Sequence, residues 1–178
     1  CSGLCSLPNP GGVPNPYTVS NYDGSAVATT SLQEQTVKSS NCAFVRLGRR
    51  VGLGKVVDFV GKLGITGIDT NISMPLGTEE VTPMKMAAAY AAFAADGQYS
   101  APYLVEKVEN AQGQVILQHQ PSPSTAMAPE VARFVTQVLE ANVERGTGTK
   151  ARLWGQPVAG KTGTTQDYAD AWFVGYSP

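Results

Sequence analysis

The sequence predicts an α+β fold, and three observations support this prediction. Segments with helical periodicity precede and intermingle with a few strand-like segments. Strands and helices do not alternate regularly and no internal repeat is visible, which argues against a parallel doubly wound sheet. The 19 glycines and 12 prolines lie mostly between the periodic segments and therefore predict long loops.

The first 29 residues are expected to be a Gly/Pro-rich loop region, because Pro8, Pro10, Pro14 and Pro16 exclude long helices and central strands. Helical periodicity begins at Thr30 and is interrupted by "SSN" at 39–41. Apolar residues then recur at helical spacing until Gly52 and Gly54 end the run, and a further short apolar helix covers 56–63. These segments predict three short helices in succession.

The central part of the chain predicts a buried helix and a hairpin. Thr82 precedes Pro83 as an N-cap precedes proline at the first helical position, and the helix that follows is apolar nearly all round until Gly97. We therefore expect this helix to be buried. The segment 103–119 alternates on both sides of 110–113, which is typical of a β-hairpin.

The last third is predicted to hold one long helix and two strands. Pro129 begins a helix that ends at 146–148, and its expected apolar face consists of Val131, Phe134, Val135, Val138 and Leu139. The run "DAWFVGYS" is aromatic and β-branched, which favours a strand.

Composition excludes several functions. A net charge of −1 with 15% charged residues gives no footprint for nucleic acid or an acidic membrane surface. The longest uncharged helical run is too short to span a bilayer, and a chain that opens on Cys1 without Met resembles an excised piece.

A Cys1–Cys5 or a Cys5–Cys42 bridge would suit an oxidising compartment. No histidine lies near these cysteines, so we expect neither a metal nor a cofactor.

The segment 155–162 matches the phosphate-loop pattern G-x-x-x-x-G-K-[ST]. That loop requires a buried strand before it and a helix after it, so that backbone N–H groups meet the phosphates. Here "GTGTKARLW" precedes the match and a second glycine with a strand-like run follows it. The context therefore argues against a nucleotide site.

An extended conformation of 158–165 gives the same residues another use. Lys161, Gly163 and Thr165 then point to one side, and Thr162 and Thr164 to the other. Glycine within a strand often marks the close approach of another backbone. A lysine and hydroxyls flanking it could hold a peptide carboxylate while the strand edge pairs with the peptide.

Several segments, in this order along the chain, resemble the bifunctional, class A penicillin-binding proteins: "NYDG" at 21–24, "SSN" at 39–41, "TEEVTPMKMAAAYAAFAADG" at 78–97, "GTGTKA" at 146–151 and "AGKTGTTQDYADAWFVGYSP" at 159–178. The resemblance covers nearly the whole chain from Tyr17 onward. It implies a fold like that of serine β-lactamases and penicillin-binding transpeptidases, an antiparallel sheet with flanking helices. It also implies that residues 1–178 are part of a transpeptidase domain truncated at both ends, with the helices, hairpin and terminal strands in 30–178.

The resemblance also implies roles for single residues. Asn41 would hydrogen-bond the donor peptide's backbone, Ser39 would relay a proton, and Lys161 would supply positive potential. Thr162, Gly163, Thr164 and Thr165 would bind substrate, with Thr164 and Lys161 holding its carboxylate. Strict strand alternation places those two on opposite faces, so a local twist or a different assignment of the two threonines stays open. Ser39 and Asn41 could instead cap the following helix.

The family's nucleophile, the serine of S-x-x-K, is not in the chain, because no serine is followed three residues later by lysine. The resemblance places that motif upstream of Cys1. It implies a peptidoglycan D,D-transpeptidase that acts on stem peptides ending in D-Ala-D-Ala and on an acceptor amine, and that is the target of β-lactam antibiotics. The parent would lie on the extracytoplasmic face of a bacterial membrane, held by an upstream anchor. A catalytically inactive peptidoglycan-binding or scaffold relative is the alternative.

Overall fold

The computed structural model describes residues 4–9, 12, 15–22, 24, 29–165 and 170–177. Each of the four sheets among them is an antiparallel pair of strands: β1-β2, β3-β6, β4-β5 and β7-β8. The strands are β1 (Leu4–Leu7), β2 (Tyr17–Ser20), β3 (Gln98–Tyr99), β4 (Lys107–Glu109), β5 (Val115–Gln118), β6 (Ser124–Thr125), β7 (Ala159–Thr164) and β8 (Ala171–Tyr176).

The α-helices are α1 (Leu32–Val37), α2 (Asn41–Val51), α3 (Leu53–Lys62), α4 (Pro83–Ala94) and α5 (Pro129–Arg145), with short 3₁₀ turns η1 (Met74–Leu76) and η2 (Thr149–Ala151). Helices and antiparallel strands thus coexist without a parallel pair in the described ranges, which confirms the α+β prediction. In the same ranges, no helix is long and apolar enough to cross a bilayer.

The expectation of a loop throughout the first 29 residues is wrong for two segments. Strands β1 and β2 form a hairpin in which Cys5 pairs with Val19. Alternate side chains of β1, Cys5 and Leu7, are buried against Cys42 and Val45 of α2. This apolar cluster outweighs the local Gly and Pro signal. Within the part of the chain that the structure describes, each of the two strands pairs only with the other, and edge strands of this kind tolerate nearby prolines.

The cysteines lie in that cluster. Cys5 and Cys42 are buried free thiols, and the Sγ of Cys42 also donates to the carbonyl of Val19 at 3.6 Å. Burial, and then the hydrogen bond with Cys5, raises the pKa of Cys42 to about 11. The two thiols are therefore neighbours without a bridge, whereas Cys1 lies outside the described residues.

Helix α4 begins and ends as predicted, with Thr82 accepting a hydrogen bond from the N–H of Lys85 and with Pro83 at the first turn. The prediction of full burial is wrong. Only Ala88, Ala89 and Ala92 are buried, because that face packs in a cluster with Leu63 and with Ala132 of α5, while the other face borders a groove along β8.

The predicted apolar face of α5 is also partly wrong. Val131 and Phe134 are 49% and 59% exposed, although Val138 and Leu139 are buried as expected. Helix α5 contacts α1, α4 and β7, so its buried stripe is set by three neighbours on different sides. That stripe consists of Ala132, Val138, Leu139, Ala141, Asn142 and Val143.

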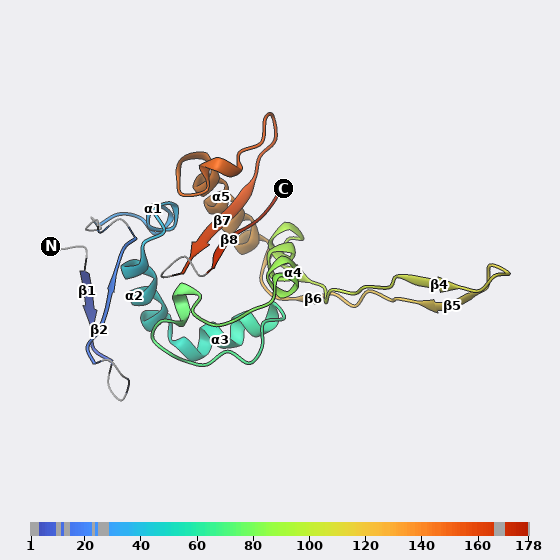
Figure 1. Ribbon diagram of the computed structural model, residues 1–178, viewed down its shortest axis with the longest axis horizontal. Helices are drawn as coiled ribbons and strands as arrows, with labels where there is room; N and C mark the ends of the chain where they lie inside the picture. The colour runs from blue at the N-terminus through green and yellow to red at the C-terminus, as the bar shows by residue number, and fades with distance from the viewer. Residues whose placement is uncertain are drawn as a thin grey trace.

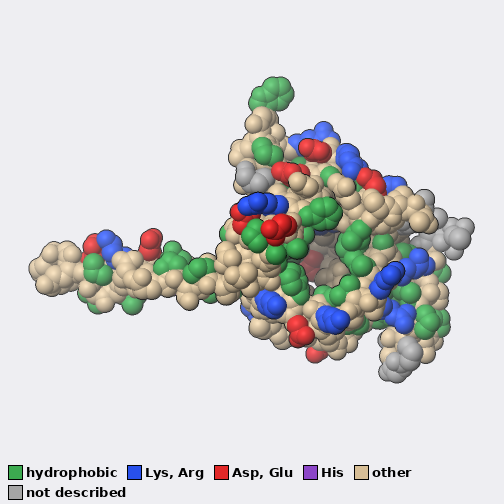
Figure 2. All heavy atoms as spheres, turned by 180° about the vertical axis from the view of Figure 1, so that it is seen from behind, with side chains coloured by type: hydrophobic (Ala, Val, Ile, Leu, Met, Phe, Trp, Pro, Cys, Tyr) green, Lys and Arg blue, Asp and Glu red, His purple; other side chains and the backbone are tan. Residues whose placement is uncertain are grey.

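The predicted hairpin is confirmed as β4 and β5, which project from the body as a long arm (Figure 1). The two terminal strands are confirmed as β7 and β8, and Figure 1 shows α5 lying beside them. Viewed from the opposite side, the body is hollowed near its centre and hydrophobic side chains gather around the hollow (Figure 2). The break between α1 and α2 and the strand β7, both close to α5, position the candidate site.

Candidate active site

Ser39 lies at the tip of the break between α1 and α2. The N–H of Ser40 donates to the carbonyl of Gln35 at 2.9 Å and the N–H of Ser39 to that of Thr36 at 3.0 Å. This pair of bonds is the Schellman ending of a helix, whose αL position is usually glycine. Ser39 occupies it with φ of 54°. A non-glycine residue in this region is strained, and such strain is found preferentially at functional sites.

Ser40, and not Ser39 or Asn41, caps the N-terminus of α2. The Oγ of Ser40 accepts from the N–H of Ala43 at 3.3 Å, so Ser40 is the N-cap of α2. Its side chain is almost fully buried and lies 3.4 Å from the Oδ1 of Asn21. The alternative that Ser39 or Asn41 merely caps this helix therefore finds no support, because Ser40 performs that role.

Asn41 is the first residue of α2, and its Nδ2 donates to the carbonyl of Ser20 at 2.8 Å. This bond joins α2 to the end of β2. A side-chain amide has two N–H donors and a carbonyl acceptor, so capacity remains for a ligand backbone.

Lys161 of β7 reaches the Ser39 break. Its Nζ donates to the Oγ of Ser39 at 2.7 Å and to the carbonyl of Thr162 at 3.0 Å. The two side chains come from positions 122 residues apart in the sequence. The fold thus places a lysine amine against a strained serine hydroxyl, an arrangement found where an amine activates or protonates a hydroxyl.

Burial lowers the pKa of Lys161 from its ordinary 10.5 to about 8. An amine with this pKa is partly neutral near pH 7 to 8, so it can both accept and donate a proton there. Perturbed pKa values of this kind gather at functional sites.

The edge of β7 that faces away from β8 has no strand partner among the described residues. Glycine at 163 is not required by internal packing, since an added Cβ would meet only the Cβ of Trp172, at 4.0 Å. At Gly160 a Cβ would come within 2.4 Å of the Phe173 ring. Gly160 thus serves internal packing, whereas Gly163 leaves the strand edge open to another backbone.

A groove of about 630 Å³ is lined by β7 and also by Trp172 and Val174 of β8, so it lies over one face of this strand pair. Lys161 and the four residues after it line one side, and Glu79, Glu80, Tyr90 and Trp172 contribute to the rest. Lys161 and Thr164 therefore border the same groove, although ideal strand alternation predicts opposite faces for them.

The predicted substrate-binding threonines differ in their contacts. The Oγ1 of Thr162 lies 2.6 Å from the Oγ1 of Thr147, which follows α5. The Oγ1 of Thr165 accepts from the N–H of Asp170 at 2.8 Å and so links the end of β7 to the start of β8. Thr164 has an exposed side chain at the groove. Of the three, Thr164 is the one whose hydroxyl is open to a ligand.

The phosphate-loop alternative fails on geometry. Residues Ala159–Thr164 are a strand, paired in register with Ala171–Tyr176. No helix begins among the described residues that follow Lys161, 162–165 and 170–177, and the strand itself does not form the N–H cradle of a phosphate loop.

Comparisons with known proteins agree with this geometry. The penicillin binding protein transpeptidase domain matches residues 7–178. The chain belongs to this transpeptidase family. Penicillin-binding protein 1A of Aquifex aeolicus is 36% identical over 158 residues, which are 89% of this chain and 22% of that protein.

Solved transpeptidases have the same fold. The D,D-transpeptidase domain of a peptidoglycan glycosyltransferase from Eggerthella lenta superposes with a TM-score of 0.80 at 28% identity, covering 99% of this chain and 50% of that one. Penicillin-binding protein A of M. tuberculosis, solved as a ceftriaxone acyl-enzyme, gives 0.80 at 25% identity, covering 99% and 46%. The expected fold class is therefore confirmed. The chain spans less than a quarter of the Aquifex relative.

Sequence patterns missed two residues beside the site. Asn142 is fully buried on α5, and Thr147 joins it to Thr162. The signal for Asn142 was an amide in an otherwise apolar stripe, between Ala141 and Val143, and Thr147 lies in the "GTGTKA" segment, to which no role was assigned.

Proposed function

We propose that this chain supplies part of the active site of a serine-type peptidoglycan D,D-transpeptidase. The observation that carries the proposal is the 2.7 Å contact between the Nζ of Lys161 and the Oγ of Ser39. The lysine lies in β7, whose outer edge has no strand partner among the described residues and whose Gly163 leaves room for a ligand backbone. Family membership supports the same reaction class.

In this mechanism the acylated serine belongs to the S-x-x-K motif of the parent, which the present sequence does not contain. A stem peptide ending in D-Ala-D-Ala transfers its acyl group to that serine, and D-Ala leaves with a proton. An amine of a second stem peptide then attacks the ester and releases the serine. The chain described here holds the donor and passes protons.

Each site residue has a role in that scheme. Ser39 and Lys161 form the proton relay, and the lowered pKa of Lys161 keeps a fraction of the amine neutral near pH 7 to 8. Asn41 binds the donor backbone. Thr164 with Lys161 holds the terminal carboxylate, and an N–H near Thr164 completes the oxyanion hole with the N–H of the nucleophile. Thr162, Gly163 and Thr165 shape the edge.

The β7 edge is also the proposed docking site for β-lactams, which imitate the D-Ala-D-Ala terminus. Penicillin-binding protein A of M. tuberculosis, with the same fold, has been solved as a ceftriaxone acyl-enzyme. We place the parent on the extracytoplasmic face of the bacterial membrane, where stem peptides are found.

The second candidate is a catalytically inactive peptidoglycan-binding or scaffold relative, which would bind peptide at the same strand without acylating a serine. The two candidates differ in whether the Lys161–Ser39 pair supports acylation of a serine supplied by another segment.

A chimera tests the proposal. The matching 158-residue region of the Aquifex relative is replaced by this chain, and covalent labelling by a fluorescent penicillin is measured. We expect labelling on a serine outside the exchanged region, reduced at least about tenfold by Ser39→Ala or by Lys161→Met. Exposed Lys150→Met is the control.

The isolated chain should not be labelled. Label mapped to Ser39, or a folded chimera that binds no penicillin covalently, would contradict the proposed role.

A further inference from the structure

Asn142 is a fully buried polar side chain on α5, the helix that contacts both α1 and β7. It lies on α5 with no exposed surface, in a stripe that is otherwise apolar. Its Nδ2 donates to the carbonyl of Val37 at 3.1 Å, with the carbonyl of Thr36 at 3.5 Å, and to the Oγ1 of Thr147 at 3.1 Å. These contacts satisfy the Nδ2 donors and fix the side chain's orientation, whereas its Oδ1 is buried without a hydrogen-bond partner among the described residues.

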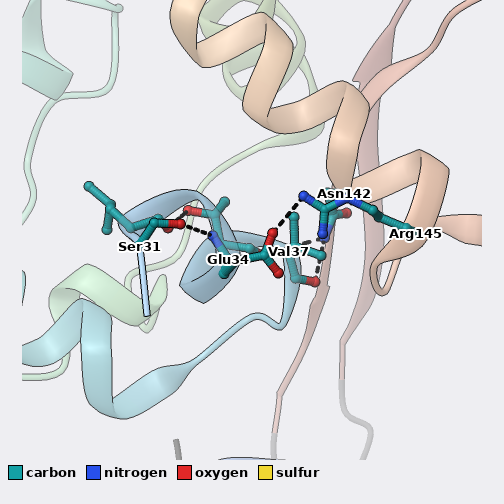
Figure 3. A network of polar contacts seen from close by, with 7 residues as sticks. Ser31, Glu34, Val37, Asn142 and Arg145 are labelled. Carbon is teal, nitrogen blue, oxygen red and sulfur yellow. Dashed lines mark hydrogen bonds and ion pairs between the residues drawn. The ribbon is translucent and has the colours of Figure 1, made fainter. Parts of the chain in front are cut away.

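The two carbonyls belong to the last turn of α1, immediately before the Ser39 break. Carbonyl groups at a helix end lack a full set of intrahelical partners, and here a side chain of another helix provides one. Figure 3 shows Asn142 pointing at Val37 while Arg145, one turn further along α5, reaches Glu34. The N–H of Thr147 also donates to the Val37 carbonyl, at 3.4 Å. Helix α5 thus holds the end of α1 from which the Ser39 turn begins.

Thr147 extends the contact to β7. Its Oγ1 accepts from Asn142 and lies 2.6 Å from the Oγ1 of Thr162, the residue after Lys161. A continuous path of hydrogen bonds therefore runs from the end of α1 through Asn142 and Thr147 to the strand that carries the lysine.

The two glycines that flank Thr147 leave no space for a side chain beside this path. A Cβ on Gly146 would lie 2.5 Å from the Val37 carbonyl and 2.8 Å from the Nδ2 of Asn142. A Cβ on Gly148 would lie 2.8 Å from the Oδ1 of Asn142. Real Cβ atoms essentially never come within 3.0 Å of another heavy atom, so a side chain at either position would displace a neighbour: the backbone carbonyl of Val37 at Gly146, and the Asn142 amide itself at Gly148. This gives a physical reason for the "GTG" at 146–148.

We infer that Asn142 is a positioning residue of the site: with Thr147 it fixes the distance between the Ser39 turn and β7, so that the Nζ of Lys161 meets the Oγ of Ser39. The inference rests on the proposed function only in treating that pair as functional. The Glu34–Arg145 ion pair, 2.6 Å long and partly exposed, joins the same two helices at the surface and does not reach the turn.

A purely structural Asn142 would affect stability and leave the environment of Lys161 unchanged. A positioning Asn142 makes a second prediction. When the turn moves away from β7, water reaches the amine and solvates its charged form, so the pKa of Lys161 rises toward its ordinary value.

The test measures that pKa in the full chain by competitive acetylation with acetic anhydride over a pH series, with the Lys161 peptide quantified by mass spectrometry. Asn142→Leu removes the donors at similar volume, and Thr147→Val cuts the link to Thr162. Leu139→Ala, a buried position on the same helix without hydrogen bonds to the turn, is the matched control for lost stability.

We expect the pKa of Lys161 to rise by about one unit in Asn142→Leu, which is a change of roughly tenfold in the protonation equilibrium of the amine. Thr147→Val should raise this pKa as well. Leu139→Ala should leave it unchanged. A folded Asn142→Leu or Thr147→Val with the wild-type midpoint overturns the inference, as does an equal rise in Leu139→Ala. If Asn142→Leu does not fold, Thr147→Val decides. The readout is one amine's titration, so it stands apart from penicillin labelling of the chimera.

Discussion

The pH dependence of stability at Lys161 is the prediction that follows most directly from the structure. Burial holds the pKa of the amine at about 8 in the folded chain, against 10.5 when it is solvated. One pKa unit corresponds to about 1.4 kcal/mol, so keeping Lys161 protonated in the folded state costs roughly 3 kcal/mol. The side chain is mostly buried, so solvent screening reduces this cost only in part.

The sign follows from proton binding. Between pH 8 and 10.5 the unfolded chain keeps the proton on Lys161 and the folded chain has released it, so the free energy of unfolding rises with pH. The cost is fully present below pH 8 and disappears above 10.5. Relative to Lys161→Met, the wild type should gain about 1.3 kcal/mol from pH 7 to 9 and about 2.5 kcal/mol by pH 10.

Urea unfolding of both proteins at pH 7, 9 and 10, followed by circular dichroism, measures this difference. Burial also raises the pKa of Tyr90 to about 12 and that of Cys42 to about 11. Those groups lower stability as pH rises, but they are present in both proteins and cancel in the comparison. Lys150→Met, at an exposed lysine, controls for the loss of a charge. A wild-type-minus-variant difference that stays constant or falls with pH would refute the reasoning.

Three further predictions concern backbone strain, the strand edge and the thiols. Ser39→Gly should be more stable than Ser39→Ala by about 1–2 kcal/mol in urea unfolding, because both lose the hydroxyl but only glycine accepts φ of 54° without strain; equal stabilities would contradict the left-handed turn. Gly160→Ala should strongly destabilise the fold, because the added methyl group would contact the Phe173 ring. Gly163→Ala should melt within a few degrees of the wild type but weaken penicillin labelling of the chimera. Full labelling of Gly163→Ala would exclude the edge as the docking site. Cys42, buried and with a pKa of about 11, should resist a thiol-reactive disulfide reagent at pH 8 until urea is added; rapid reaction in the folded chain would show that the β1–α2 cluster opens.

Local sequence determined several elements, among them the two that carry the site. The "SSN" break, the N-cap at Thr82 and the hairpin at 110–113 depend on hydrogen bonds within a few residues, and the structure has each of them where the pattern predicted. The strand at Lys161 was likewise fixed by its neighbours, since a glycine and β-branched residues follow it in place of a helix.

Tertiary packing decided what those elements do together. The contact of Lys161 with Ser39, the pKa of that amine and the burial of Asn142 all arise between segments more than 100 residues apart. The first hairpin also depends on another segment, because Cys5 and Leu7 pack against Cys42 and Val45 of α2. Local periodicity reports which residues of one segment share a face. It contains no information about which other segment covers that face, because burial and desolvation are properties of the packed pair.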